Sequence, residues 1–81
     1  MPLFVIEREF ADVFDPDDET IQLVDDYNTE HDLKWLTSFL SADKKKTYCL
    51  YECEDIEALR RHATDLGLPA DTITEVTELE R

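Results

Sequence analysis

Hydrophobic and polar residues alternate along this chain in a pattern that predicts four strands and two helices. Residues 2–10 hold aliphatic side chains and two phenylalanines, with their charges toward the far end, which favours a strand over a helix. Residues 33–41 and 46–53 are short, rich in aromatic and aliphatic side chains, and joined by a polar turn, which is typical of a β-hairpin. Residues 71–79 predict a final strand.

The segment that follows the first strand predicts a helix. Asp15 is a suitable N-cap, Pro16 suits the first helical position, and acidic residues follow in the first turn, where the helix dipole favours negative charge. We expect this helix to extend to about His31. Its predicted inner stripe follows spacings of three and four: Thr20, Leu23, Val24, Tyr27 and His31.

The second helix has clear start and stop signals. Asp55 is its predicted N-cap, and Gly67, the only glycine of the chain, stands where a left-handed C-terminal residue is needed, with Pro69 beyond it. Its apolar stripe is regular: Ile56, Leu59, Ala63 and Leu66. The order β-α-β-β-α-β predicts an α+β, ferredoxin-like fold, a single domain over residues 1–81 whose four-stranded antiparallel sheet carries both helices on one face.

Two helices cover only one face of such a sheet, and the other face should be polar if it meets water. The hairpin has apolar residues in both alternating sets, with Trp35 and Phe39 expected on one side and Leu36 and Leu40 on the other. We therefore expect the second face to be buried, most simply against another copy in a homodimer. A ligand-filled cleft is the alternative, and the two are compatible.

The composition indicates which partners are unsuitable and which compartment to expect. The net charge of −13, from 21 acidic and 8 basic side chains, makes nucleic acid and anionic membrane poor partners. No apolar run approaches the length of about 20 residues of a membrane span, and no leader-like segment opens the chain, so we expect a soluble, cytoplasmic protein. Cys49 and Cys53 stand about 13 Å apart along a strand, too far for a disulfide, which favours buried free thiols and a reducing compartment.

Five stretches, in this order and spacing, resemble a known family: MPLFVIEREF, KWLTSF, KTYCLYECED, EALRRHA and GLPADTITEV. The chain resembles the small ferredoxin-like proteins grouped as domain of unknown function 4242, some of which are described as nickel-binding. The resemblance implies a dimer of facing sheets, like the dimeric α+β barrels that include small monooxygenases and muconolactone-type isomerases. Members often have histidine at the position of Thr37, so a nickel site is not carried over. Seven positions match the family without assigned roles: Trp35, Ser38, Tyr48, Cys49, Tyr51, Glu52 and His62.

Divalent metal binding is the first functional hypothesis. Nickel or zinc would take imidazole, thiolate and carboxylate ligands, and the leading set is Cys49, Glu52 and His62. The wider set of possible ligands adds Cys53, Glu7, Glu9 and His31. The spacing is poor for a metal site, because the chain contains no CxxC or HxxxH pair. His62 is better explained as a flank residue of its helix, with a general base at the rim of the sheet as the alternative, and His31 as a complement to the helix dipole.

The second hypothesis is a small-molecule pocket, in a binding module or in an enzyme of the isomerase or monooxygenase-like kind. Its expected lining is Trp35, Thr37, Tyr48, Tyr51 and Glu7, with Glu52 as an alternative polar group and Phe39 and Ser38 as further candidates. No nucleophilic constellation or glycine-rich nucleotide loop is visible. The third hypothesis is a self-associating module without chemistry of its own.

Overall fold

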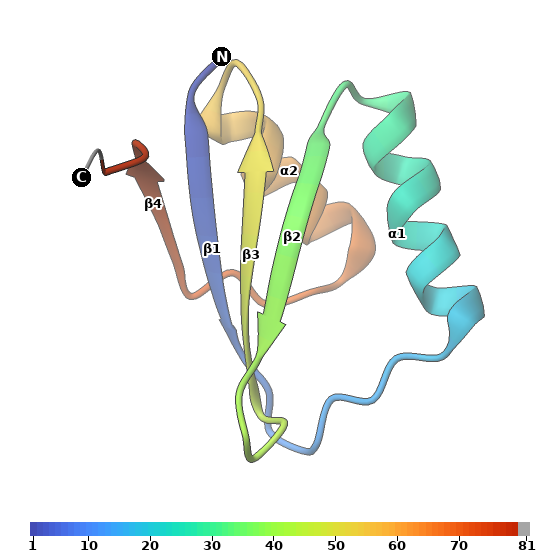
Figure 1. Ribbon diagram of the computed structural model, residues 1–81. Helices are drawn as coiled ribbons and strands as arrows, with labels where there is room; N and C mark the ends of the chain where they lie inside the picture. The colour runs from blue at the N-terminus through green and yellow to red at the C-terminus, as the bar shows by residue number, and fades with distance from the viewer. Residues whose placement is uncertain (80–81) are drawn as a thin grey trace.

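A computed structural model describes residues 1–79 of the chain. Its elements are β1 (Leu3–Glu9), α1 (Asp18–Glu30), β2 (Lys34–Leu40), β3 (Lys46–Glu52), α2 (Ile56–Leu66) and β4 (Thr72–Val76). This order confirms the predicted β-α-β-β-α-β fold (Figure 1). Residues 80 and 81 of the predicted domain lie outside the described part. Neither described helix is long and apolar enough to cross a bilayer.

The four strands form one antiparallel sheet in the order β2-β3-β1-β4. The register between the two central strands places Phe4 beside Tyr51 and Ile6 beside Cys49. These residues are buried, whereas their neighbours along each strand are only half-buried. Because side chains alternate between the faces of a strand, the sheet has an inner face toward the helices and an open face on the other side.

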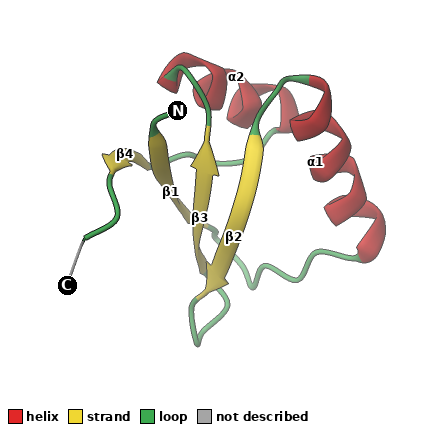
Figure 2. Ribbon diagram, turned by 45° about the horizontal axis from the view of Figure 1, so that its top comes forward, coloured by secondary structure: helices red, strands yellow, loops and turns green. Residues whose placement is uncertain are grey.

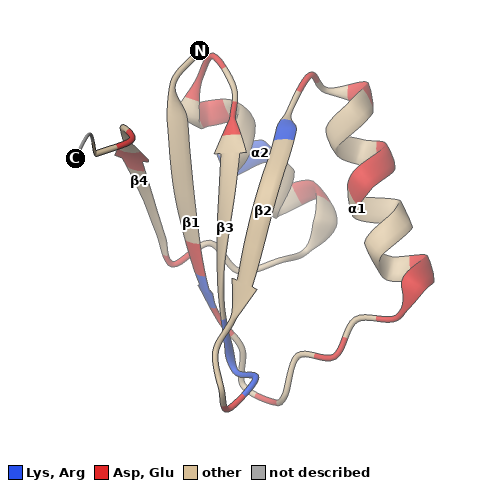
Figure 3. Ribbon diagram, viewed as in Figure 1, with Lys and Arg blue, Asp and Glu red and all other residues tan. Residues whose placement is uncertain are grey.

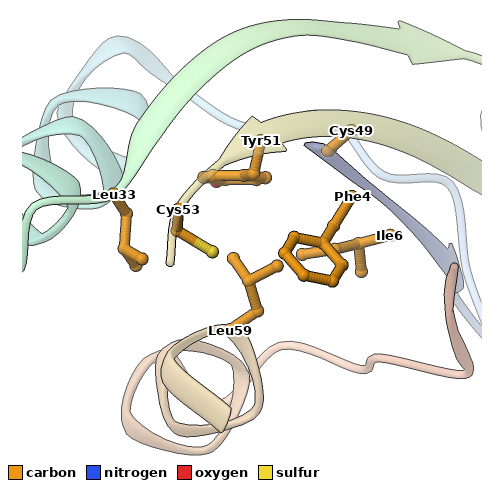
Figure 4. Packing of buried hydrophobic residues seen from close by; sticks show 7 residues of the cluster. All are labelled: Phe4, Ile6, Leu33, Cys49, Tyr51, Cys53 and Leu59. Carbon is orange, nitrogen blue, oxygen red and sulfur yellow. The ribbon is translucent and has the colours of Figure 1, made fainter. Parts of the chain in front are cut away.

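The core lies between the inner face and α2. The buried apolar cluster consists of Phe4, Ile6, Leu33, Cys49, Tyr51, Cys53 and Leu59. Figure 4 shows Leu59 pointing from α2 toward the side chains of the sheet. Both cysteines are buried and free, as the sequence predicts.

The ends of α2 confirm their sequence signals. The carboxylate of Asp55 accepts a hydrogen bond from the Glu57 amide at 3.0 Å. Gly67 adopts the left-handed conformation, with φ 66°, and the next amide, of Leu68, donates to the Ala63 carbonyl at 2.9 Å. A side chain at Gly67 would be strained in this conformation, which explains why glycine occupies this position.

The predicted start of α1 is wrong by two residues. The N-cap is Asp17, whose carboxylate accepts from the Thr20 amide at 2.8 Å, and the helix begins at Asp18. Asp15 has the same carboxylate acceptor, so the sequence alone does not show which of the two aspartates is the N-cap. The later start leaves Pro16 outside the helix, where it is half-buried against the apolar lining of a cavity described below.

The predicted inner stripe of α1 is only partly correct. Val24 and Tyr27 are half-buried, but Leu23 is 62% exposed and the buried residue of this helix is Asn28. The reason is the position of the helix: α2 lies behind the sheet, whereas α1 stands beside the edge strand β2 (Figures 1 and 2). A helix packed along one narrow line leaves much of its apolar surface in water.

A β-bulge changes which face of the sheet the side chains of β2 point to. The register with β3 shifts between Trp35 and Thr37, which pair with Tyr51 and Leu50. Trp35 therefore shares the inner face with Ser38, whereas Phe39 pairs with Tyr48 on the open face. A bulge inserts one residue and reverses the alternation that a regular strand would keep, so by register Trp35 and Phe39 do not share a face as predicted, although both border the cavity described below.

Acidic residues recur along α1 and in the loops, whereas the turn between β2 and β3 also carries lysines (Figure 3). The open face carries both charge signs. Lys46 and Glu7 form an ion pair there at 3.6 Å, and Lys34 lies opposite Glu52 across the β2–β3 pairing.

Candidate functional site

A cavity of about 240 Å³ opens between the inner face of the sheet and the two helices. We call it the helix–sheet cavity. Its walls are mainly apolar: Ile21 and Val24 come from α1 and Trp35 from β2. Phe10 and Phe14, in the segment between β1 and α1, stack with their ring centres 4.2 Å apart and border the same cavity. The space exists because α1 stands beside the sheet instead of lying across it.

Arg8, Tyr51 and His62 border this cavity and form its polar floor. They are buried, with exposed fractions of 3%, 1% and 0%. Arg8 Nη2 lies 3.5 Å from His62 Nδ1, and the Tyr51 hydroxyl lies 3.3 Å from His62 Nε2. Asn28, also buried, donates from Nδ2 to the same hydroxyl at 3.3 Å.

Arg8 has no anionic partner among the described residues. The ion pairs of residues 1–79 join Lys46 to Glu7 and Arg60 to Glu57, and the buried Nε of Arg8 has no hydrogen-bond partner. Burying a charged group without compensation is costly, so an unpaired guanidinium in this position requires an explanation.

His62 is held in its neutral form. Its burial, followed by the positive charge of Arg8, lowers the pKa of His62 to about 4. Arg8 carries only donors, so it donates to Nδ1, and the ring hydrogen must then sit on Nε2 and point at the Tyr51 oxygen. The prediction that His62 is a flank residue is wrong, since the side chain is completely buried.

Tyr51 keeps its proton. Burial raises the pKa of Tyr51 to about 12, although Asn28 and Arg8 act in the opposite direction. Its oxygen accepts hydrogen bonds from Asn28 and from His62. Its own hydrogen is therefore left to donate elsewhere, and Tyr51 borders the cavity.

The predicted metal ligands do not come together. Cys49 lies on the inner face and His62 on α2, but the register places Glu52 opposite Leu3 and Lys34 on the open face. Within residues 1–79, no three side chains of histidine, cysteine, aspartate or glutamate are grouped so that they could hold a metal ion. This covers the wider set as well: Cys53, Glu7, Glu9 and His31.

The predicted pocket residues are divided between the two faces of the sheet. Trp35 and Tyr51 border the cavity together, with their rings nearly parallel at 11° and centred 6.3 Å apart. Thr37, Tyr48 and Glu7 lie on the open face instead. Ser38 joins the inner group, where it accepts a hydrogen bond from Trp35 Nε1 at 2.7 Å.

Two residues of this network were not predicted from the sequence: Arg8 of the polar floor, and Asn28, which hydrogen-bonds to Tyr51. Arg8 follows Phe4 and Ile6 at intervals of two, so strand alternation alone would have placed it on the inner face. Only its charge, near the end of the predicted strand, was considered. No signal in the sequence marks Asn28, because an asparagine near the end of a helix is usually exposed.

Comparison with known proteins places the chain in a family. A sequence profile described as "Nickel responsive protein SCO4226-like" matches residues 4–76. The chain belongs to the SCO4226-like family. The resemblance noted from its sequence is thereby confirmed.

One solved structure similar to this SCO4226-like chain is the crystal structure of SCO4226 from Streptomyces coelicolor A3(2). The TM-score is 0.79 at 20% sequence identity, and the match covers 96% of this chain and 99% of the other. At this identity the likeness supports the fold alone. No protein with a curated description matches the chain.

Proposed function

We propose that this SCO4226-like domain binds a small, mainly apolar molecule in the helix–sheet cavity. The observation that supports this is a cavity of about 240 Å³ with apolar walls and a floor of buried polar groups. Apolar lining with a few convergent polar groups is the usual composition of a ligand site. A domain of 81 residues has little interior to spare, so an open apolar space of this size is costly unless something fills it.

Binding explains the polar floor better than catalysis by His62 does. Both ring nitrogens of His62 are engaged, one by Arg8 and one by the Tyr51 hydroxyl. A general base needs a free nitrogen within reach of its substrate and a pKa near the working pH. His62 instead positions its two neighbours, so an isomerase-like or monooxygenase-like activity has less support.

The nickel relation of the family does not extend to a site built from the residues singled out in the sequence. Cys49, Glu52 and His62 would have to surround one ion, but Glu52 projects from the opposite face of the sheet. The residues of one chain therefore do not fit a nickel ion in that arrangement.

The proposed site is tested with paired variants of α1. We expect Val24→Phe, which places a ring in the cavity, to weaken binding of a neutral aromatic probe such as benzamide at least tenfold. Leu23→Phe is the matched control, since Leu23 is 62% exposed on the same helix, and it should leave binding unchanged. Trp35 is the only tryptophan of the chain and borders the cavity, so its fluorescence reports binding directly. Equal binding by both variants would place the probe elsewhere and refute the proposed site.

We also propose that two copies pair through the open face. Its apolar residues are Leu3, Val5, Phe39, Tyr48, Leu50 and Val76. Lys34 and Lys46 stand among Glu7, Glu9 and Glu52 on this face, so it carries about one net negative charge although the whole chain carries −13. A second copy presents the same mixture of apolar and oppositely charged groups, which suits an isologous interface.

The pairing is tested by Leu50→Glu. We expect this variant to change the molar mass in light scattering from twice the chain mass to the chain mass of 9.5 kDa, because it places a charge at the centre of the open face. Leu23→Glu, on the exposed side of α1, should remain dimeric. Retention of the dimer by a folded Leu50→Glu protein would exclude this interface.

The cysteines support the expected compartment. Both are buried and unpaired, which suits a reducing environment, and we propose a cytoplasmic location on this ground.

A further inference from the structure

Every polar group that the floor of the cavity offers is a hydrogen-bond donor. Arg8 has only donors, and its Nε is buried without a partner. The Tyr51 oxygen already accepts from Asn28 and His62, so its remaining capacity is the hydrogen of its own hydroxyl. A ligand that satisfies both groups must bring acceptor atoms to this floor.

The charges around the cavity also favour a ligand that brings acceptor atoms. Arg8 is the only charged side chain among the described residues that border the cavity, and none of them is acidic. In a chain with 21 acidic and 8 basic residues, this leaves a single buried positive charge facing an apolar space. One positive charge is balanced by one negative charge, and the planar guanidinium matches the two oxygens of a carboxylate.

We propose that the ligand of the helix–sheet cavity is a small organic monocarboxylate, which binds Arg8 and the Tyr51 hydroxyl with its anionic end and packs its apolar body against Trp35 and α1. This inference rests on the proposed function, since it specifies the ligand of the same site. It also explains the unpaired arginine: the missing anion is supplied by the ligand. The network of His62 and Asn28 then holds the two donors in place, so both are positioning residues.

Two probes separate the effect of the ligand's charge from the effect of its size and shape. Benzoate and benzamide have the same ring and nearly the same size, and differ in that benzoate is an anion. We expect the wild-type chain at neutral pH to bind benzoate about 10- to 100-fold more tightly than benzamide, since hydrogen bonds to charged groups exceed neutral ones by this order. The titration is run at 0.15 M salt, where the Debye length of about 8 Å screens the distant carboxylates of the chain.

Three variants test the assigned donors. Arg8→Met should lose the preference for benzoate over benzamide, whereas Arg8→Lys should keep part of the preference. Tyr51→Phe removes one donor and should weaken benzoate about tenfold. If Arg8→Met does not fold, Arg8→Lys and Tyr51→Phe still give the answer.

The outcomes separate this inference from the proposed function. Equal affinity of the wild type for the two probes would overturn the carboxylate while leaving the cavity as a binding site. A preference for benzoate that persists in folded Arg8→Met would also overturn it, because recognition would then lie elsewhere. Binding of neither probe by the folded wild type would overturn both proposals.

Discussion

Replacing Arg8 by methionine is expected to stabilise the ligand-free protein, raising the free energy of unfolding by about 1–3 kcal/mol. Arg8 is 3% exposed and has no carboxylate partner among the described residues. Methionine matches the aliphatic stem of arginine as far as Nε and carries no charge that must be removed from water. A residue that reduces stability where it stands is typical of a binding site, where function and stability compete.

Urea unfolding of the free protein, without any carboxylate in the buffer, measures this effect. Arg8→Lys is the control, because it keeps the buried charge and should give no gain. Adding benzoate should reverse the order of stability, since the wild type binds benzoate more tightly than Arg8→Met does and therefore gains more from it. A clear loss of stability in Arg8→Met without ligand would show that the arginine serves the fold, and would remove the reason to expect an anion.

The stability of the protein is expected to fall by on the order of 3 kcal/mol as the pH is lowered from about 6.5 to about 4. The pKa of His62 is near 6.5 in the unfolded chain and about 4 in the folded one, so within this window the unfolded state binds the additional proton. The stabilising contribution of neutral His62 is therefore complete above pH 6.5 and is lost as the pH falls toward 4.

The environment of His62 includes several groups that take part in this dependence. Arg8 lowers its pKa and Asp65 raises it, with Asp65 also accepting a hydrogen bond from Tyr27 at 2.6 Å. His31 adds a smaller effect that lowers the pKa.

Unfolding measured at a series of pH values for the wild type and His62→Gln isolates the contribution of the histidine. Glutamine is neutral throughout and keeps a hydrogen-bonding group, so the difference between the two curves should grow as the pH rises from 4 to 6.5. The titration of the carboxylates changes the stability of both proteins equally and therefore cancels in the difference. Parallel curves across this window would mean that His62 titrates normally in the folded state, and would contradict its assignment as a buried neutral group.

Much of the fold could be predicted from the sequence because its signals are local. The cap at Asp55, the left-handed Gly67 and the hairpin pattern each act within a few residues, and the structure confirms all of them. The errors arose where two local choices were equivalent or where one residue changed the pattern. Asp15 and Asp17 are both good caps, and the bulge after Trp35 reversed the facing of Phe39.

The candidate site was harder to predict because it depends on the placement of a helix. Trp35 and Tyr51 were correctly expected to lie together, since cross-strand pairing joins them. Arg8 and His62 meet only through the packing of α2 on the sheet, 54 residues apart in the chain, and no spacing rule encodes that contact. The cavity itself exists because α1 stands beside β2, which its amphipathic pattern does not specify.

The most direct test of this account is a crystal structure of the full chain grown with benzoate. We expect an open helix–sheet cavity that holds the ring against Trp35, with the carboxylate within hydrogen-bond distance of the Arg8 guanidinium and the Tyr51 hydroxyl. A structure in which α1 closes onto the sheet, leaves no space for a ring and pairs Arg8 with a carboxylate of the chain would contradict it.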